Sequence, residues 1–187
     1  GIDQTYVATC DSEIANYIQS IGGSIVMTST HHTRATTRTA EAVQIIESEL
    51  GASIEIVVMV QGDEPLILPN TIAETHAHFR DPTVGIVNIM SRLLTYDQFI
   101  DRNNVKVVVN KMNDALYFSR ASVPHNRNPM GIQGGSYKHL GLYAYRKDFL
   151  MTFVRLPRGE LERIEGLEQL RALEAGYKIK TVLTDTP

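Results

Sequence analysis

The sequence has a single cysteine, Cys10, among its 187 residues, so no disulfide can form within the chain. It has no apolar run approaching the roughly 20 residues that a membrane-spanning helix needs. Basic residues are not in surplus either, since 18 Lys and Arg against 21 Asp and Glu give a formal net charge of −3. Binding of nucleic acid through phosphate neutralisation is therefore not expected. These absences predict a soluble, cytoplasmic protein with no nucleic-acid partner and no membrane span.

Several motifs of nucleotide-binding and hydrolytic enzymes are missing as well. The chain has no G-x-x-x-x-G-K-[ST] loop, no G-x-G-x-x-G turn and no G-x-S-x-G elbow. It also lacks a Cys/His cluster for zinc, and the adjacent His31 and His32 are poorly spaced to chelate one metal ion. The charge balance is nevertheless compatible with a small anionic ligand held by a few placed arginines.

The hydrophobic residues that are present, 43% of the chain, are enough for one globular core. Their pattern alternates between short apolar runs and helical spacing, which is typical of an α/β fold. Helices are predicted after Asp11, after Thr37, after Pro69, and over residues 148–154 and 160–174. Strands are predicted over residues 5–9, 24–27, 56–60, 84–89, 105–109, 115–118, 140–145 and 179–183.

Two of these strand patterns indicate how the sheet is built. The run 56–60 is apolar without alternation, which predicts a parallel strand near the centre of the sheet with helices on both sides. The runs 105–109 and 115–118 are separated by the polar turn 110–114, which predicts an antiparallel hairpin. We therefore expect a mixed, mostly parallel sheet with one antiparallel hairpin.

The first candidate site is Gln61-Gly62-Asp63-Glu64-Pro65, directly after the apolar run 56–60. In open α/β sheets, ligands bind at the carboxyl ends of the strands. Carboxylates at that edge could hold Mg²⁺ against a substrate phosphate. The alternative is a polar turn with Asp63 or Glu64 near a helix N-terminus, and spacing alone does not decide between the two.

The second candidate is the polar segment 31–41, which runs into the start of a predicted helix. Helix N-termini favour anions, and threonine hydroxyls with Arg34 and Arg38 add donors suited to a phosphate or a base edge. On the residues alone, the simpler alternative is favoured: Thr36 or Thr37 caps the helix while the arginines are solvated.

A third group of polar side chains surrounds a late strand and the helix after it. Glu168 lies seven residues after Leu161 and four after Ile164, so the helical period places it beside apolar side chains, at the edge of the core or in a pocket. Taken singly, His139 and Tyr143 are more often core residues than catalytic ones. The members of the group are His139, Tyr143, Arg146, Glu165, Glu168 and Gln169.

Seven segments together resemble the 3-deoxy-manno-octulosonate cytidylyltransferases, also called CMP-Kdo synthetases. Each alone is weak, but their order and spacing cover nearly the whole chain, which makes the series specific. The segments are 7–9 with Asp11, 34–42, 60–65, 104–108, 115–120, 138–146 and 162–171.

The resemblance implies a three-layer, glycosyltransferase-A-like nucleotidyltransferase fold, a homodimer and a place in lipopolysaccharide biosynthesis. It also implies a reaction in which the anomeric hydroxyl of a 3-deoxy sugar acid attacks the α-phosphate of CTP, giving a CMP-sugar and pyrophosphate. In that reaction the cofactor Mg²⁺ neutralises the phosphates, and positioning with charge stabilisation supplies most of the catalysis.

The roles that the resemblance implies fall into three groups. Asp63 becomes the metal ligand and, with Arg120, a catalytic residue. The implied nucleotide-binding residues are Ala35, Thr36, Arg38 and Gln61, and the implied sugar-binding residues are His139, Tyr143, Glu168 and Gln169.

The chain departs from the family pattern in three places. Its segment 35–38 reads Ala-Thr-Thr-Arg where the family has Gly, Thr, an acidic residue and Arg. The family's opening strand and triphosphate loop would precede Gly1, and its second metal ligand is either Asp185 or a residue of a segment that follows. We therefore expect residues 1–187 to form a single nucleotidyltransferase domain that lacks the family's two ends and is inactive alone.

Two other functions stay open at the level of sequence. One is a cytidylyltransferase for a different nonulosonic or octulosonic acid, because the sugar-side residues are the least securely transferred. The other is an inert nucleotide-sugar-binding or dimerisation domain that has kept the fold.

Overall fold

The computed structural model describes residues 2–64, 67–127 and 135–184. Its local structure follows from a few residues: Asp11 accepts hydrogen bonds from the backbone of Glu13 and Ile14 and so caps α1, and Pro69 begins α3. The elements of the first half are β1 (Tyr6–Thr9), α1 (Ser12–Ser20), β2 (Ser24–Met27), α2 (Ala35–Leu50), β3 (Ile56–Val60), α3 (Pro69–Ala77) and the 3₁₀ helix η1 (His78–Arg80).

The second half begins with a buried strand and contains the predicted hairpin, β5 with β6, in antiparallel register. The prediction missed the helix α4, whose five residues are too few to show a helical period. The elements are β4 (Ile86–Arg92), α4 (Tyr96–Ile100), β5 (Lys106–Val109), β6 (Ala115–Ser119), β7 (Ser136–Arg146), α5 (Lys147–Phe153), α6 (Glu160–Glu165), α7 (Leu170–Glu174) and β8 (Lys180–Thr184).

The long strand β7 organises the main sheet, because it pairs with β4 along one edge and with β5 and β3 along the other. All of these pairs are antiparallel, whereas β8 lies parallel to β4. The mixed sheet is confirmed, but among the described strands the antiparallel pairs outnumber the parallel ones. The expectation of a mostly parallel sheet is therefore corrected, since every pair that β7 makes is antiparallel.

The prediction for β3 is also wrong. It runs antiparallel to β7, and within the described residues β7 is its only strand partner, so β3 is not central. Its apolar side chains reflect packing on both faces: Met59 belongs to one core cluster, and Ile56 and Val58 pack against another. An edge strand covered on both faces thus has the sequence of a central one.

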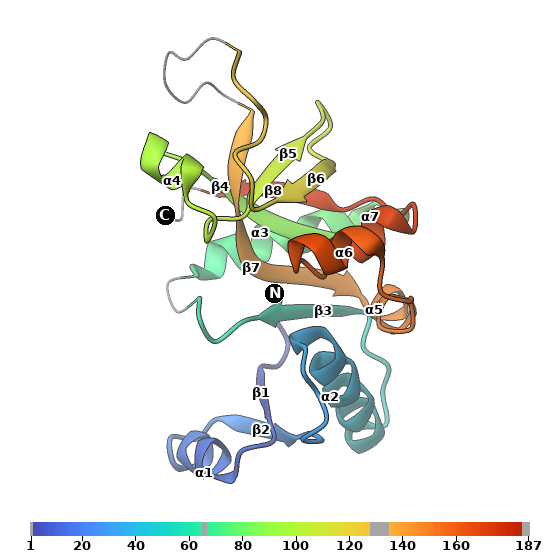
Figure 1. Cartoon of the computed structure of the whole chain (residues 1–187). Coiled ribbons are helices and arrows are strands. Elements are labelled where there is room, and N and C mark those ends of the chain that lie inside the picture. Colours follow the sequence, from blue (N-terminus) through green and yellow to red (C-terminus); the bar gives the residue numbers. More distant parts are fainter. Residues whose placement is uncertain (1, 65–66, 128–134, 185–187) are drawn as a thin grey trace.

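A smaller unit stands beside this sheet. The strands β1 and β2 form a separate parallel pair, with α1 and α2 packed against them. In Figure 1 this unit lies below β3, and α2 reaches up toward α5. The N-terminus of α2 lies near the main sheet, because Thr36 donates a hydrogen bond to Glu168, although α2 mostly covers the small sheet.

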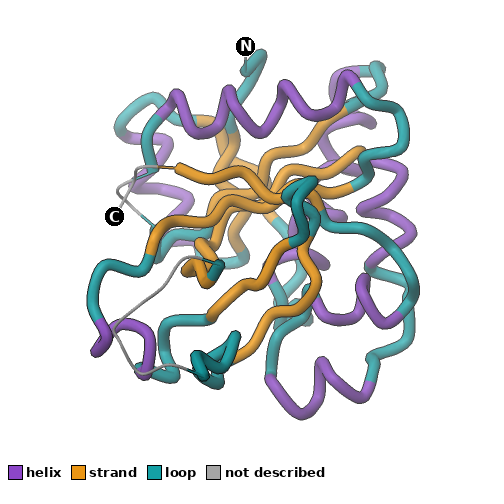
Figure 2. Tube along the Cα trace, turned by 90° about the horizontal axis from the view of Figure 1, so that it is seen from above, coloured by secondary structure: helices purple, strands orange, loops and turns teal. Residues whose placement is uncertain are grey.

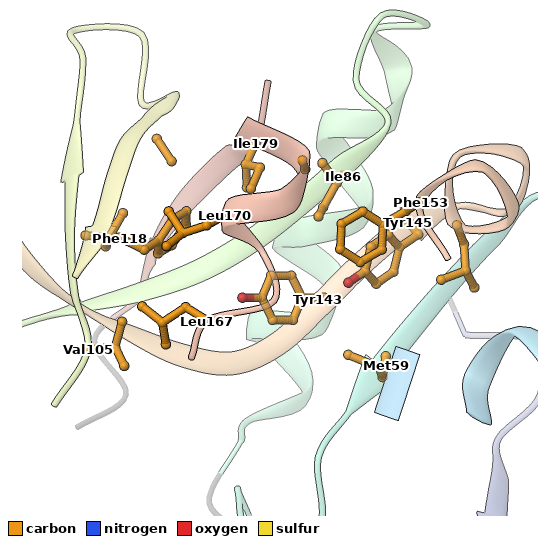
Figure 3. Packing of buried hydrophobic residues seen from close by; sticks show 14 of the residues in the cluster. Met59, Ile86, Val105, Phe118, Tyr143, Tyr145, Phe153, Leu167, Leu170 and Ile179 are labelled. Carbon is orange, nitrogen blue, oxygen red and sulfur yellow. The ribbon is translucent and has the colours of Figure 1, made fainter. Parts of the chain in front are cut away.

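Helices cover both faces of the main sheet (Figures 1 and 2), which gives the expected three layers. On one face, Tyr143 and Tyr145 of β7 pack with Phe153, Leu167 and Leu170 (Figure 3). On the opposite face, a second cluster gathers under α3 and η1. None of the described helices is long and apolar enough to span a bilayer.

The single helix predicted over residues 160–174 is two helices. Gly166 has a φ of 67°, in the left-handed region, and its N–H donates to the carbonyl of Glu162 to close α6. The chain then turns before α7 starts at Leu170. The segment 166–169 is thereby free to leave the helix axis, which matters for the cavity described below.

Gly51 ends α2 with a φ of 62°. It caps its helix in the same left-handed conformation as Gly166, so the two glycines can be tested together. Beyond the adjoining backbone, no atom lies within 4 Å of a Cβ built at either glycine. We expect Gly51→Ala and Gly166→Ala each to lower the free energy of unfolding by about 1 kcal/mol, because alanine is strained in this conformation. Urea denaturation measures both; equal or higher stability of the variants would contradict the left-handed caps.

Candidate functional site

A cavity of about 350 Å³ opens where β7, the N-terminus of α2 and the segment 166–169 meet. Most of the site residues that the sequence predicted line it, although they come from distant parts of the chain. The remaining lining residues are mainly apolar side chains of the core. The predicted residues that line the cavity are Arg34, Ala35, Thr36, Gln61, Arg120, His139, Tyr143, Glu168 and Gln169.

Glu168 joins two sides of this cavity. Its Oε1 accepts a hydrogen bond from Thr36 Oγ1 at 2.7 Å and one from Arg171 Nη2 at 3.3 Å. Glu168 does line a pocket, as predicted, but the reason given for it, a helical period counted from Leu161 and Ile164, was wrong. The helix α6 ends at Gly166, before Glu168. It is the break after α6 that directs Glu168 toward the N-terminus of α2.

A buried ion pair holds Arg171 in place. Glu162, which is 0% exposed, accepts from Arg171 Nε at 2.8 Å and from Nη2 at 2.9 Å, and from Arg158 Nε at 3.1 Å. Burial works to raise the pKa of Glu162, but its hydrogen bonds and the charges of Arg171 and Arg158 outweigh burial and lower it. The guanidinium also lies over the ring of Phe153, 5.1 Å from its centroid. Arg171 is thus held in place as a hydrogen-bond donor to Glu168.

Arg120 is positioned through its backbone. Glu165 accepts from Ser119 Oγ at 2.6 Å and from the Arg120 N–H at 3.0 Å, while the buried Lys106 donates to the Arg120 carbonyl at 2.8 Å. The Arg120 side chain donates to the carbonyls of Glu165 and Arg102. Within the described residues no carboxylate forms an ion pair with its guanidinium. Its charge is therefore available to an anion in the cavity.

His139, which is partly buried, and the buried Tyr143 form a pair on β7. His139 Nδ1 lies 2.9 Å from Asn88 Oδ1, and its Nε2 lies 3.4 Å from the Tyr143 hydroxyl. Burial, with the charge of Lys138, lowers the pKa of His139 to about 4. Burial, with Tyr145 and Glu168, raises the pKa of Tyr143 well above its usual range. Both side chains are therefore neutral near pH 7.

Gln169 carries the one buried side-chain polar atom that lacks a hydrogen-bond partner in the described part of the chain. This atom is Nε2, in a side chain that is 7% exposed and lines the cavity. An unsatisfied buried donor costs about 1–3 kcal/mol. A ligand oxygen in the cavity would remove that cost.

The N-terminus of α2 has no side-chain cap, so the capping alternative for Thr36 and Thr37 is wrong. Thr36 donates to Glu168, and Thr37 donates to the Arg34 carbonyl. Arg38, predicted to bind nucleotide, does not line the cavity: its guanidinium bonds to Thr28 Oγ1 and to loop carbonyls. Arg38 thus holds the loop before α2.

Asp63 also lies outside the cavity lining, exposed in the turn after β3. Its neighbour Glu64 has a structural partner, because Glu64 Oε1 accepts from the Gly141 N–H at 2.9 Å. Among the described residues, no three His, Cys, Asp or Glu side chains gather as metal ligands. Pro65 and Asp185 fall outside the residues that the structure describes.

The sequence reasoning missed the residues that hold the lining side chains. They are Asn88, Lys106, Glu162 and Arg171. Arg146, which the sequence grouped with the site, instead donates to the carbonyls of Phe79, Asp81 and Val84, away from the cavity lining. Lys106 and Asn88 have a usable signal, since a polar side chain within an apolar strand pattern must find partners when it is buried.

Comparison with known proteins gives consistent matches. A family model described as cytidylyltransferase matches residues 1–179. The 3-deoxy-manno-octulosonate cytidylyltransferase of Syntrophotalea carbinolica is 44% identical over 98% of this chain and 74% of its own length. The 8-amino-3,8-dideoxy-manno-octulosonate cytidylyltransferase of Shewanella pealeana is 42% identical, with the same two coverages. A solved structure of CMP:2-keto-3-deoxy-manno-octonic acid synthetase, complexed with CTP, matches with a TM-score of 0.86 and 34% identity, over 98% of this chain and 73% of that one.

The α/β fold with its mixed sheet, together with these matches, identifies the chain as a nucleotidyltransferase. Within that class, the chain belongs to the cytidylyltransferase family.

The buried pair of Glu162 and Arg171 gives a first test of the site. We expect Glu162→Gln to lower the free energy of unfolding at pH 7 by about 3 kcal/mol, because the buried Arg171 loses its doubly bonded carboxylate and keeps only the longer contact with Glu168. Since folding lowers the pKa of Glu162, the pair's contribution is present above the ordinary value of 4.5 and is lost as the pH falls below it. Urea denaturation at several pH values measures both effects. Glu160→Gln, exposed in the same helix, is the control, and an equal loss in the two variants would contradict the assignment.

The low pKa of His139 gives a second test of the site. Between pH 6.5 and 4 the unfolded chain binds more protons at this residue than the folded chain, so the free energy of unfolding falls as the pH is lowered through that window. We expect a loss of up to roughly 3 kcal/mol from this group, and a smaller loss in His139→Gln. An NMR titration should show the His139 imidazole unchanged down to about pH 5; a midpoint near its ordinary value would contradict its burial as a neutral group.

Proposed function

We propose that this protein transfers a cytidylyl group from CTP to a 3-deoxy sugar acid, 3-deoxy-manno-octulosonate or a close analogue, and releases pyrophosphate. The observation that carries the proposal is the cavity, in which Arg120, without a carboxylate partner, and the unpaired amide of Gln169 both line the wall. A cation and a neutral donor suit a ligand that bears a carboxylate and several hydroxyls. Membership of the cytidylyltransferase family supports CTP as the nucleotide substrate.

The cytidine side of the cavity would be formed by α2 and β3. The first turn of α2 has backbone N–H groups without a side-chain cap, beside Ala35, and Gln61 adds an amide from the end of β3. Such donors and acceptors suit the edge of a cytosine base or an anionic oxygen. Arg38 would serve the nucleotide indirectly, by holding the loop that leads into α2.

The sugar acid would lie on the β7 side. Arg120 would bind its carboxylate, while Gln169, Tyr143 and Glu168 would bind its hydroxyls. Because Glu168 already accepts from Thr36 and Arg171, it has a fixed position and can accept one more hydroxyl. The chain would thereby hold the anomeric hydroxyl of the sugar near the α-phosphate of CTP, and positioning of this kind is a major source of rate.

Asp63 would hold Mg²⁺ at the rim of the cavity. Its carboxylate is exposed and takes part in no ion pair of the described residues. This fits the usual mode of Mg²⁺ binding, through one or two carboxylates together with substrate phosphates. When bound, the ion would neutralise phosphate charge. The attack forms the bond between the sugar oxygen and the α-phosphorus, breaks the bond to pyrophosphate and releases the hydroxyl proton to solvent.

The identity of the sugar acid is the part of the proposal with a specific rival. The relative from Shewanella pealeana is named for the 8-amino analogue, and donors such as Gln169 do not separate a hydroxyl from an amine at a distant carbon. Assays with each sugar acid in turn would rank the two by kcat/KM.

Pyrophosphate release tests the proposal. Release should require CTP, Mg²⁺ and the sugar acid together, and Asp63→Asn should abolish it while the fold is kept, because only an exposed charge is removed. Asp148→Asn, an exposed carboxylate on α5, is the control. Release by Asp63→Asn within about tenfold of the parent, or about 1.4 kcal/mol, would contradict the role of Asp63. Release without sugar acid would contradict the transfer reaction.

A further inference from the structure

The strand β7 contains a bulge opposite Asn88. Asn88 pairs in register with Tyr143, whereas Met90 pairs with His139, so β7 has additional residues between the two pairs. In a bulge the carbonyls of the longer strand lose their ladder partners. Here Asn88 Nδ2 donates to the carbonyls of Leu140 and Leu142, each at 2.9 Å.

These two bonds fix the orientation of the Asn88 amide. Carbonyl oxygens can only accept, so the nitrogen must face Leu140 and Leu142 and the oxygen must point the other way. That oxygen lies 2.9 Å from His139 Nδ1. Asn88 is 0% exposed, so it has no contact with bulk solvent.

An acceptor at this position determines which His139 nitrogen has the proton. Asn88 Oδ1 can only accept, so His139 Nδ1 must donate, and in a neutral imidazole the other nitrogen then has a lone pair. The Tyr143 hydroxyl, 3.4 Å from Nε2, becomes the donor to that lone pair. Its own oxygen lone pairs are left for the cavity that Tyr143 lines.

We propose that Asn88 is a positioning residue of the sugar side: it holds His139 as the Nδ1–H tautomer, so that the Tyr143 oxygen acts as a hydrogen-bond acceptor toward the ligand. The second half of this proposal rests on the proposed function. It means that the ligand group facing Tyr143 must be a donor, a hydroxyl or an amine, and that an ether or a carbonyl at that position binds less well.

The tautomer is measured first, in the parent chain, by long-range ¹H–¹⁵N NMR of the imidazole nitrogens. His139→Gln identifies the His139 signals among the six histidines. We expect a protonated Nδ1 and an unprotonated Nε2, the reverse of the form that free histidine prefers. A protonated Nε2 would overturn the proposal, and this readout needs neither activity nor a substitution at Asn88.

The variant Asn88→Ala should release His139 to the Nε2–H form and weaken binding of 3-deoxy-manno-octulosonate roughly tenfold, as expected for one hydrogen bond. CTP affinity should not change. Tyr143→Phe should weaken sugar-acid binding in the parent but add little in Asn88→Ala, because both changes interrupt the same chain of hydrogen bonds. Additive losses would overturn the link through His139.

Thr181→Val is the control for a general loss of packing. Thr181 is buried on β8, in register with Asn88, and its hydroxyl donates to the Asn113 carbonyl away from the cavity. Its removal should lower stability and leave the tautomer and the sugar-acid affinity unchanged. If the parent chain has the expected tautomer but binds no 3-deoxy sugar acid, the proposed function fails while the assignment of Asn88 to the tautomer stands.

Discussion

The backbone bulge in β7 is the constraint on which the cavity depends. It lies where β4 pairs with β7. Two side chains from opposite sides satisfy its polar groups: Asn88 donates to the carbonyls of Leu140 and Leu142, and Glu64 accepts from the Gly141 N–H. A Cβ at Gly141 would lie 3.1 Å from Glu64 Cγ, so the absence of a side chain lets the turn after β3 approach. The polar groups of the bulge are thus satisfied from both neighbouring segments, β4 and the turn after β3.

A second constraint joins the two parts of the fold. The small β1–β2 unit shares no strand pairing with the main sheet in the described residues, yet Thr36 at the start of α2 bonds to Glu168. Glu168 is in turn held by Arg171, and Arg171 by the buried Glu162. The proposed nucleotide side and the proposed sugar side are therefore connected through one carboxylate. On this proposal, a movement of α2 when CTP binds would reach the residues assigned to the sugar acid.

Local structure and the lining residues could be predicted from the sequence, whereas their supports could not. The Asp11 cap and the hairpin turn act within a few residues, so their signals are local. The direction of β3 depends on its partner β7, some 80 residues later, and an apolar run does not encode that choice. Similarly, Glu165 looked like a site residue, but its carboxylate is used to hold Ser119 and Arg120. Asn88, like Lys106, is a polar residue within an apolar strand and must find partners when it is buried. The sequence does not reveal those partners, because a bulge depends on the register of two strands rather than on either sequence.

The central claim is that the sugar acid and CTP occupy different walls of one cavity. The side-chain amide of Gln169 reports on this most directly, because Nε2 has no partner in the described residues and lines the proposed sugar side. Its ¹H–¹⁵N signals can be followed by NMR, with Gln169→Glu as the assignment control, while CTP and 3-deoxy-manno-octulosonate are added separately. The account predicts a large, saturable shift with the sugar acid and a small one with CTP. A Gln169 amide that is unchanged at saturating sugar acid, or that responds equally to CTP, would contradict it.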